Sequence, residues 1–243
     1  MKKSILFVFI SVLVFSGSVL QAQIGIGAGY LNSTFKTKSG GSIIKSDPFH
    51  GFYAGLDYNL DIAYGLSVTF GLDYSFLSSK DESSLRIPLV DLTLKNRQQE
   101  HYLNIPVNIA YTFTIVDNFK IFAYGGPRFV VGLASRNKSD ATGDFLGIRI
   151  DGDFVYDFYK DEIKSDNLSD QFLESINQNF LGNTGKHSRF DLQLGVGIGF
   201  ELFNLLTIKG GYDWGLLNRY RGNYADNNSL KRNQFYVGLG IVF

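Results

Sequence analysis

The feature that most constrains this chain is a strict alternation of bulky apolar residues with small or polar ones. The last ten residues, QFYVGLGIVF, place Phe235, Val237 and Leu239 on one face and Gly238 and Gly240 on the other. Successive side chains of a strand point to opposite sides, so this pattern predicts a β-strand with two unlike faces. Seven other segments share the pattern, namely 24–30, 51–60, 65–76, 101–113, 120–133, 189–202 and 206–216. We therefore predict eight strands.

The face opposite the bulky residues indicates where the strands lie. It is rich in glycine, which would only weaken a strand that faces water but relieves crowding inside a narrow closed barrel. The bulky face carries aromatic residues near strand ends, where the girdles of a membrane barrel lie. These are Tyr30, Tyr74, Tyr111, Phe113, Trp214 and Phe243. We predict an all-β fold, an eight-stranded antiparallel transmembrane β-barrel whose bulky face contacts lipid.

The connections between the predicted strands alternate in length. The short ones are 59–65, 114–118 and 203–205, and the long ones are 36–50, 78–97, 134–187 and 218–232. Bacterial outer-membrane barrels have short periplasmic turns and longer extracellular loops, so the alternation supports this class over a soluble β-barrel. The longest loop, 134–187, includes a helical pattern at 167–180. A ten-stranded barrel that uses part of this loop is the alternative.

The N-terminus predicts export. Lys2 and Lys3 precede an apolar run of 11 residues, Ile5–Phe15, which is shorter than the roughly 20 residues of a membrane-spanning helix. This pattern is typical of a cleaved signal peptide, which we place at residues 1–22, with the barrel domain at 23–243. There is no cysteine, and the net charge of zero gives no basic field for nucleic acid.

Charged residues fall on the inward face of the predicted strands. Their positions in the alternation place six acids inward, namely Asp57, Asp73, Glu100, Asp191, Glu201 and Asp213, with Lys209, Arg128 and Lys120 as basic partners. Eight strands leave an interior that side chains fill, and buried charges persist only when they are paired. We therefore predict a polar network that closes the lumen. The alternative is a narrow, cation-selective pore for small solutes.

Few residues of this chain offer catalytic or metal chemistry. A histidine, a serine and an acid at the outer rim would suit acyl transfer, and His187 is followed by Ser188. However, adjacent residues of a strand face opposite ways, and His50 and His187 are expected to be solvated loop residues. Three acids at 151, 153 and 157 share a face but do not match a calcium-loop pattern. We predict no enzyme activity, metal or cofactor, with a barrel-embedded hydrolase as the weakest alternative.

The stretch HYLNIPVNIAYTF followed by FKIFAYGGPRFVVGL resembles the PorT-like outer-membrane β-barrel family of Bacteroidetes. The matching positions are Tyr102, Leu103, Ile105, Pro106, Gly126 and Pro127. The resemblance implies a barrel in the bacterial outer membrane, in a family whose members mostly have unknown roles and whose named member assists type IX secretion. Because proline cannot donate to a ladder, we predict a β-bulge at Pro106.

Three kinds of partner follow from these expectations. The bulky face predicts outer-membrane lipid, and the strand ending at Phe243 resembles the signal that outer-membrane assembly machinery reads. Other envelope or secretion proteins would bind the loops or turns, and nucleic acid is not expected. The predicted function is a structural or partner-binding envelope component.

Overall fold

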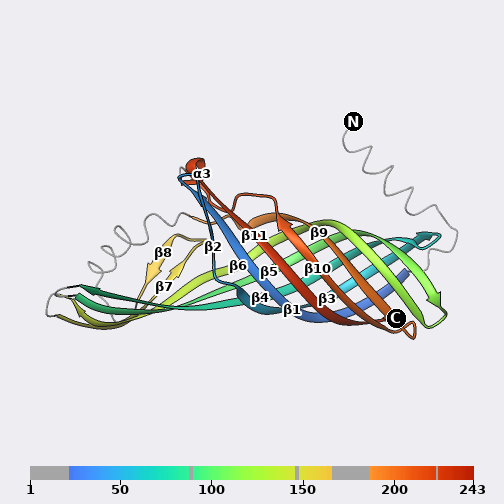
Figure 1. The fold of residues 1–243 in the computed structure, drawn as a ribbon, viewed down its shortest axis with the longest axis horizontal. Helices are drawn as coiled ribbons and strands as arrows, with labels where there is room; N and C mark the ends of the chain where they lie inside the picture. The colour runs from blue at the N-terminus through green and yellow to red at the C-terminus, as the bar shows by residue number, and fades with distance from the viewer. Residues whose placement is uncertain (1–21, 88–89, 146–147, 166–185, 223) are drawn as a thin grey trace.

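The computed structural model describes residues 22–243 except 88–89, 146–147, 166–185 and 223. Eight strands close into a ring in which each pairs antiparallel with both of its neighbours (Figure 1). Round the ring they are β1 (Ala22–Ser39), β3 (Phe49–Ala63), β4 (Leu66–Ile87), β5 (Val90–Val116), β6 (Phe119–Phe145), β9 (Phe190–Leu202), β10 (Leu206–Gly215) and β11 (Asn228–Val242). The predicted all-β, eight-stranded antiparallel fold is confirmed.

The remaining elements attach to the ends of ring strands. These are β2 (Ser42–Lys45), β7 (Ile148–Asp157), β8 (Glu162–Lys164) and the short helix α3 (Tyr224–Asn227). Strand β2 pairs with the end of β1, β7 pairs with the end of β6, and β8 pairs with β7. Strands β7 and β8 of the 134–187 segment are therefore extended but add no strand to the ring, and the ten-stranded alternative is wrong.

The two ends of the ring differ. At one end, which we call the short-turn end, β3 joins β4, β5 joins β6 and β9 joins β10 by tight connections. At the other, the long-hairpin end, β4 and β5 stay paired as far as Ile87 and Val90, and β5 and β6 stay paired as far as Phe145 (Figure 1). Apart from the undescribed residues 88–89, the predicted loop 78–97 is thus strand, and so are residues 134–145 and 148–157 of the predicted loop 134–187. Residues 78–84 and 134–144 lack the apolar alternation, but their backbone groups satisfy each other in a ladder that continues past the apolar part of the ring.

Two predictions lie wholly or mostly outside the described residues. The predicted signal peptide, residues 1–22, lies outside the described residues except for Ala22, the first residue of β1. The predicted helix at 167–180 lies wholly in the gap at 166–185. Both stay predictions. Among the described residues, no helix has the length and hydropathy needed to cross a membrane.

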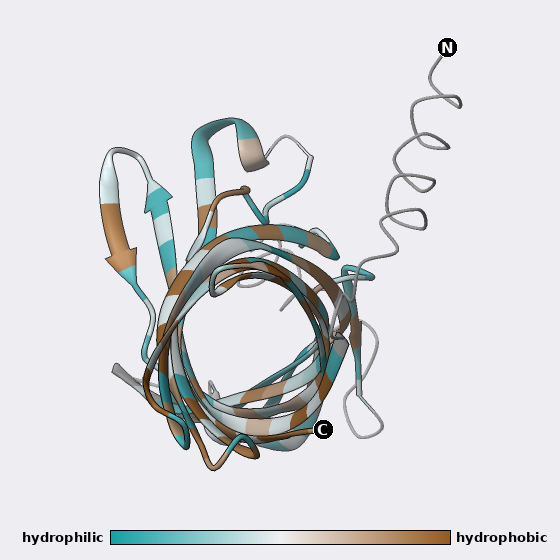
Figure 2. Cartoon of the chain, turned by 90° about the vertical axis from the view of Figure 1, so that its right-hand side faces the viewer, coloured by the Kyte–Doolittle hydropathy of each residue, from teal (hydrophilic) through white to brown (hydrophobic). Residues whose placement is uncertain are grey.

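The pleat of the ring strands sorts the side chains by face. Bulky apolar residues point outward and are exposed, including Leu56 at 51%, Val196 at 51% and Leu239 at 64% (Figure 2 shows the ring end-on, coloured by hydropathy). Inward positions carry buried polar residues and, toward the long-hairpin end, one apolar cluster. This cluster comprises Leu31, Phe35, Phe49, Tyr53, Leu77, Tyr102, Val130, Leu230 and Tyr236.

Pro106 interrupts the ladders without shifting them. Its neighbours pair with β4 as Phe70 with Val107 and as Asp73 with Asn104, which is the same register on both sides of the gap. The register shifts of β5 against β6 lie instead at His101/Tyr102 and Thr114/Val116, so the bulge predicted at Pro106 is wrong. The proline ring fits because Gly71 faces it; a Cβ on Gly71 would lie 2.6 Å from Pro106 Cγ.

Candidate functional site: the interior of the ring

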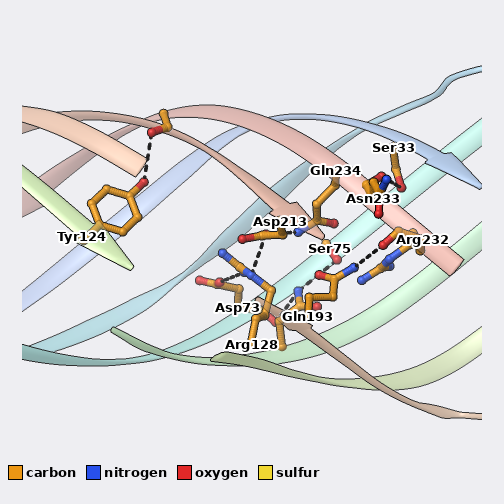
Figure 3. A network of polar contacts seen from close by, with 12 residues as sticks. Ser33, Asp73, Ser75, Tyr124, Arg128, Gln193, Asp213, Arg232, Asn233 and Gln234 are labelled. Carbon is orange, nitrogen blue, oxygen red and sulfur yellow. Dashed lines mark hydrogen bonds and ion pairs between the residues drawn. The ribbon is translucent and has the colours of Figure 1, made fainter. Parts of the chain in front are cut away.

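One arginine joins two walls at the centre of the interior. Arg128 of β6 places Nη1 2.9 Å from Asp73 Oδ2 of β4, and its Nε lies 2.9 Å from Asp213 Oδ2 of β10 (Figure 3). Nη1 donates a hydrogen bond to Asp73, whereas Nε is out of line for one to Asp213. The Arg128 side chain is 11% exposed and those of its partners are 7% and 2% exposed. One cation thus bridges two carboxylates from strands that are not neighbours in the ring.

Amide side chains extend this contact toward the long-hairpin end. Gln234 Nε2 donates to Asp213 Oδ2 at 2.7 Å, and Gln193 Nε2 donates to the backbone carbonyl of Arg232 at 3.1 Å (Figure 3). On the facing wall, Asn104 Nδ2 donates to Ser75 Oγ at 3.0 Å. These side chains are all buried, so polar groups fill the bore at this level.

Three tyrosines lie beside Arg128 on the short-turn side. The Arg128 guanidinium lies 5.3 Å from the ring centroid of Tyr236, whose ring meets that of Tyr53 edge-on at 6.0 Å. Tyr124 Oη donates to the Gly210 carbonyl at 3.3 Å (Figure 3). The Tyr53 ring needs a glycine opposite it, because a Cβ on Gly238 would lie 2.0 Å from Tyr53 Oη.

The half of the interior nearest the short turns holds a cavity of about 120 Å³. The ion pair of Lys209 with Asp57 lines it, and so does Glu201, whose Oε1 lies 2.7 Å from Lys120 Nζ. Their side chains are 13–25% exposed, more than those of the Arg128 group. The remaining lining mixes glycine and apolar residues with polar ones, which include Gln23, Asn59, Thr69, Asn108, Thr112 and Thr207. The space is large enough for several water molecules or a small polar solute.

A second buried charged group lies at the long-hairpin end. Glu100 is fully buried, and its carboxylate accepts hydrogen bonds from Tyr102 Oη, Ser135 Oγ and Gln98 Nε2. Arg219 Nη2 lies 3.4 Å from Glu100 Oε2. The guanidinium of a second buried arginine, Arg232, stacks 3.9 Å from the centroid of the Tyr102 ring.

The sequence prediction missed both arginines because it placed them in loop 218–232. Arg232 carried a signal that was available, since it continues the inward positions Gln234 and Tyr236 of the same strand. Arg219 carried none, because its position depends on a connection that folds back over the opening of the ring.

The connections at this end contact each other directly. The Arg221 N–H donates to the Lys186 carbonyl at 2.8 Å, and the Ser188 N–H donates to the Arg219 carbonyl at 2.6 Å. His187 forms an isolated bridge with Tyr220 and stacks on Phe158 at 4.6 Å between ring centroids. Backbone pairing and aromatic stacking therefore join the 134–187 and 218–232 segments over the opening.

His187 and Ser188 do not form a catalytic pair. His187 is 6% exposed, so the expectation of a solvated rim histidine is wrong for this residue. Burial, and then the charge of Arg219, lower the pKa of His187 to about 3. The Ser188 hydroxyl donates to the Phe190 carbonyl, and His187 Nδ1 has no hydrogen-bond partner among the described residues. His50 is exposed and bonds to the Tyr30 hydroxyl.

The other predicted site residues are placed as follows. Asp191 is 2% exposed, and its Oδ1 accepts from the Leu192 N–H at 2.9 Å. No group of three or more metal-ligating side chains occurs in the part of the chain that the structure describes. The six aromatic residues of the predicted girdles all point outward and are 37–71% exposed; they are Tyr30, Tyr74, Tyr111, Phe113, Trp214 and Phe243.

A comparison with known families identifies the fold. A family model described as "Outer membrane protein beta-barrel domain" matches residues 6–243. The chain belongs to this family. It is therefore a barrel of the bacterial outer membrane, in agreement with the apolar outer face and polar interior of the ring.

Solved structures of other outer-membrane proteins are similar to this barrel in fold alone. Ail, the attachment invasion locus protein of Yersinia pestis, is 14% identical, with 92% of this chain and 100% of that chain covered and a TM-score of 0.41. OprG of Pseudomonas aeruginosa is 10% identical, with coverage of 91% and 95% and a TM-score of 0.39. The outer membrane protease OmpT of Escherichia coli is 9% identical, with coverage of 94% and 99% and a TM-score of 0.40. No curated protein sequence matches the chain significantly.

Proposed function

We propose that this barrel is a non-conducting structural or partner-binding component of the outer membrane, of the PorT-like class, without enzyme activity. The observation that carries the closed lumen is the contact of Arg128 with Asp73 and Asp213. A solvated ion would have to separate charges held 2.9 Å apart in a bore with little exposed surface. The Glu100–Arg219 group is a second obstruction nearer the long-hairpin end.

The long hairpins support the partner-binding part of the proposal. Strand β3 pairs with β4 only as far as His50 with Ser78, whereas β4 continues to Ile87 with β5 alone on its other side. Among the residues that the structure describes, no strand pairs with residues 82–87 on that side, so this part of β4 presents an open strand edge beyond the ring. Unpaired N–H and C=O groups on such an edge are a template for an added strand from another protein. Secretion or other envelope proteins are the proposed partners, and the PorT-like assignment rests on the six motif positions.

Planar-bilayer recordings test the closed lumen. We expect the purified protein to show no steady open channel, and we expect Arg128→Ala to introduce brief openings. Steady conductance in the unmodified protein would refute the closed lumen and favour the alternative, a narrow pore. One observation supports that alternative, namely the cavity in the short-turn half.

Site-specific photocrosslinking in the native envelope tests the partner-binding part. A crosslinker at Glu82, on the open edge, is compared with one at Tyr64, a fully exposed turn residue at the opposite end. We expect one discrete adduct from position 82 and none of that mass from position 64. The same adduct from both positions, or none from position 82, would refute binding at this edge.

The absence of enzyme activity is tested with His187. Lipid and peptide hydrolysis by the purified protein are measured before and after His187→Ala. Turnover that disappears in this variant would overturn the proposal in favour of the barrel-embedded hydrolase.

A further inference from the structure

Three lysines lie directly opposite one another on neighbouring strands, on the outer surface of the barrel. We call this row the lysine rung. Lys36 of β1 pairs with Lys231 of β11 on one side and with Lys45 of β2 on the other. All three are exposed. Among the residues that the structure describes, none of the three has a carboxylate within 4.0 Å. Lys38 lies two residues further along β1, on the same face and also exposed.

This arrangement is unfavourable without an anion. Side chains directly opposite on neighbouring antiparallel strands have Cβ atoms about 4.5–5.5 Å apart, and like charges in such pairs destabilise the sheet. Lys36 takes part in two of these pairs at once. The ion pairs of the interior neutralise their charges within the ring, whereas the lysine rung leaves its charges to an external partner.

The height of the rung on the wall suggests which partner this is. Lys231 and Phe235 lie on the same outward face of β11, four residues apart, and Phe235 is 48% exposed in the apolar band. Four residues span about 13 Å along a strand, or about 10 Å along the membrane normal at the usual tilt of a barrel strand. The headgroup layer begins at the edge of the hydrocarbon core and is roughly 5–8 Å thick. The flexible lysine stems bring their ammonium groups into that layer.

The hairpin formed by β1 and β2, which carries Lys36 and Lys45, has an amphiphilic turn. Ile43 and Ile44 of β2 are 69% and 62% exposed, and Ile43 pairs with Lys38, on the lysine face. The far end of β1, together with β2 and α3, stands beside the outline of the ring and apart from the long hairpins (Figure 1). Exposed isoleucines flanked by lysines are typical of segments that lie in a membrane interface. The hairpin therefore faces the membrane surface and not the lumen.

We propose that Lys36, Lys45 and Lys231 bind the phosphate groups of outer-leaflet lipids, with Ile43 in contact with the headgroup layer. With the long hairpins outside the cell, as in other bacterial barrels, the rung faces the outer leaflet. The bound groups neutralise the three ammonium charges and hold the β1–β2 hairpin against the membrane. This proposal does not depend on whether the lumen conducts.

The test measures binding of bisphosphorylated lipid A to the detergent-solubilised full barrel. The variant Lys36→Gln/Lys45→Gln/Lys231→Gln is compared with Lys80→Gln/Lys160→Gln/Lys186→Gln, which removes three other exposed lysines. Folding of every variant is checked by heat-dependent migration on gels. Each basic residue near an anionic surface contributes to binding, so we expect the first variant to lose at least about tenfold in affinity and the control variant to keep the original affinity.

Two further probes distinguish the sources of phosphate. Dephosphorylated lipid A is expected to bind both the unmodified barrel and the first variant equally weakly, and inorganic phosphate is expected to compete poorly. Equal losses in the two variants would show a general charge effect and overturn the proposal. Tight binding of dephosphorylated lipid A would show apolar adsorption, and tight binding of inorganic phosphate would show a free-anion site; either result would also overturn it.

Discussion

Replacement of Arg128 by methionine tests whether the central contact stabilises the barrel. Methionine keeps much of the side-chain length and removes the charge that faces Asp73 and Asp213. Both carboxylates then remain in a site where they are 7% and 2% exposed. Removal of one partner of a buried ion pair costs about 3–5 kcal/mol, because the remaining charge is buried and uncompensated. We expect a loss of free energy of unfolding in this range.

Urea unfolding in lipid vesicles measures this loss. Trp214, the only tryptophan of the chain, faces outward and reports the transfer from lipid to water through its fluorescence. The matched control is Arg136→Met, which removes an arginine that is 60% exposed and lies 3.6 Å from Asp157. An exposed pair contributes roughly 0–1 kcal/mol, so the control should barely change the unfolding midpoint.

A charge-cancelled variant separates the electrostatic cause from loss of packing. In Asp73→Asn/Arg128→Met/Asp213→Asn no charge remains in the group, so most of the lost stability should return. Equal losses in the single and the triple variant would show that packing, and not an uncompensated charge, is responsible. A loss below about 1 kcal/mol in Arg128→Met would refute the reasoning altogether.

Three further predictions concern other parts of the barrel. Gly238→Val should cost about 1–3 kcal/mol in urea unfolding, because its Cβ would lie 2.0 Å from Tyr53 Oη, and an unchanged midpoint would contradict this packing. Burial lowers the pKa of His187 to about 3 in the folded protein, whereas the unfolded chain keeps the ordinary value of about 6.5. Between these pH values only the unfolded state takes up the proton, so the free energy of unfolding should fall as the pH drops from about 6.5 toward 3. The loss should reach about 2 kcal/mol at pH 5 and be absent in His187→Gln. Tyr64→Asn should gain up to about 1 kcal/mol in urea unfolding, because Tyr64 has a φ of 51° that asparagine tolerates better; an unchanged or lower stability would contradict this strain argument.

The alternation of side chains predicted the ring strands because it depends only on the chain itself. Leu239 and Gly238 face opposite ways in any strand, and the choice of the bulky face as the outer one followed from the chemistry of the two faces. The limits of the strands could not be predicted in this way. Residues 79–87 and 134–145 are polar on both faces, so their strand structure depends on their pairing with β5 and β7.

The sequence also placed the acids Asp57, Asp73 and Glu100 on the inward face, but it did not say which base each would meet. The position of a residue in the alternation along one strand tells whether its side chain points inward or outward. Its charged partner depends instead on ring closure and on the relative stagger of the strands. Arg128 meets acids from β4 and β10, and Glu100 meets Arg219 from a connection that was predicted as a long loop.

By itself, then, the sequence determined the class of fold, the number of ring strands and the face that meets lipid, because a two-residue period is a local property of an extended chain. Only the tertiary structure decided which charges pair, that His187 is buried, and that Lys231 joins the distant Lys36 and Lys45 in one rung. Those features arise between segments that come together when the ring closes, and no local pattern encodes the register in which they meet.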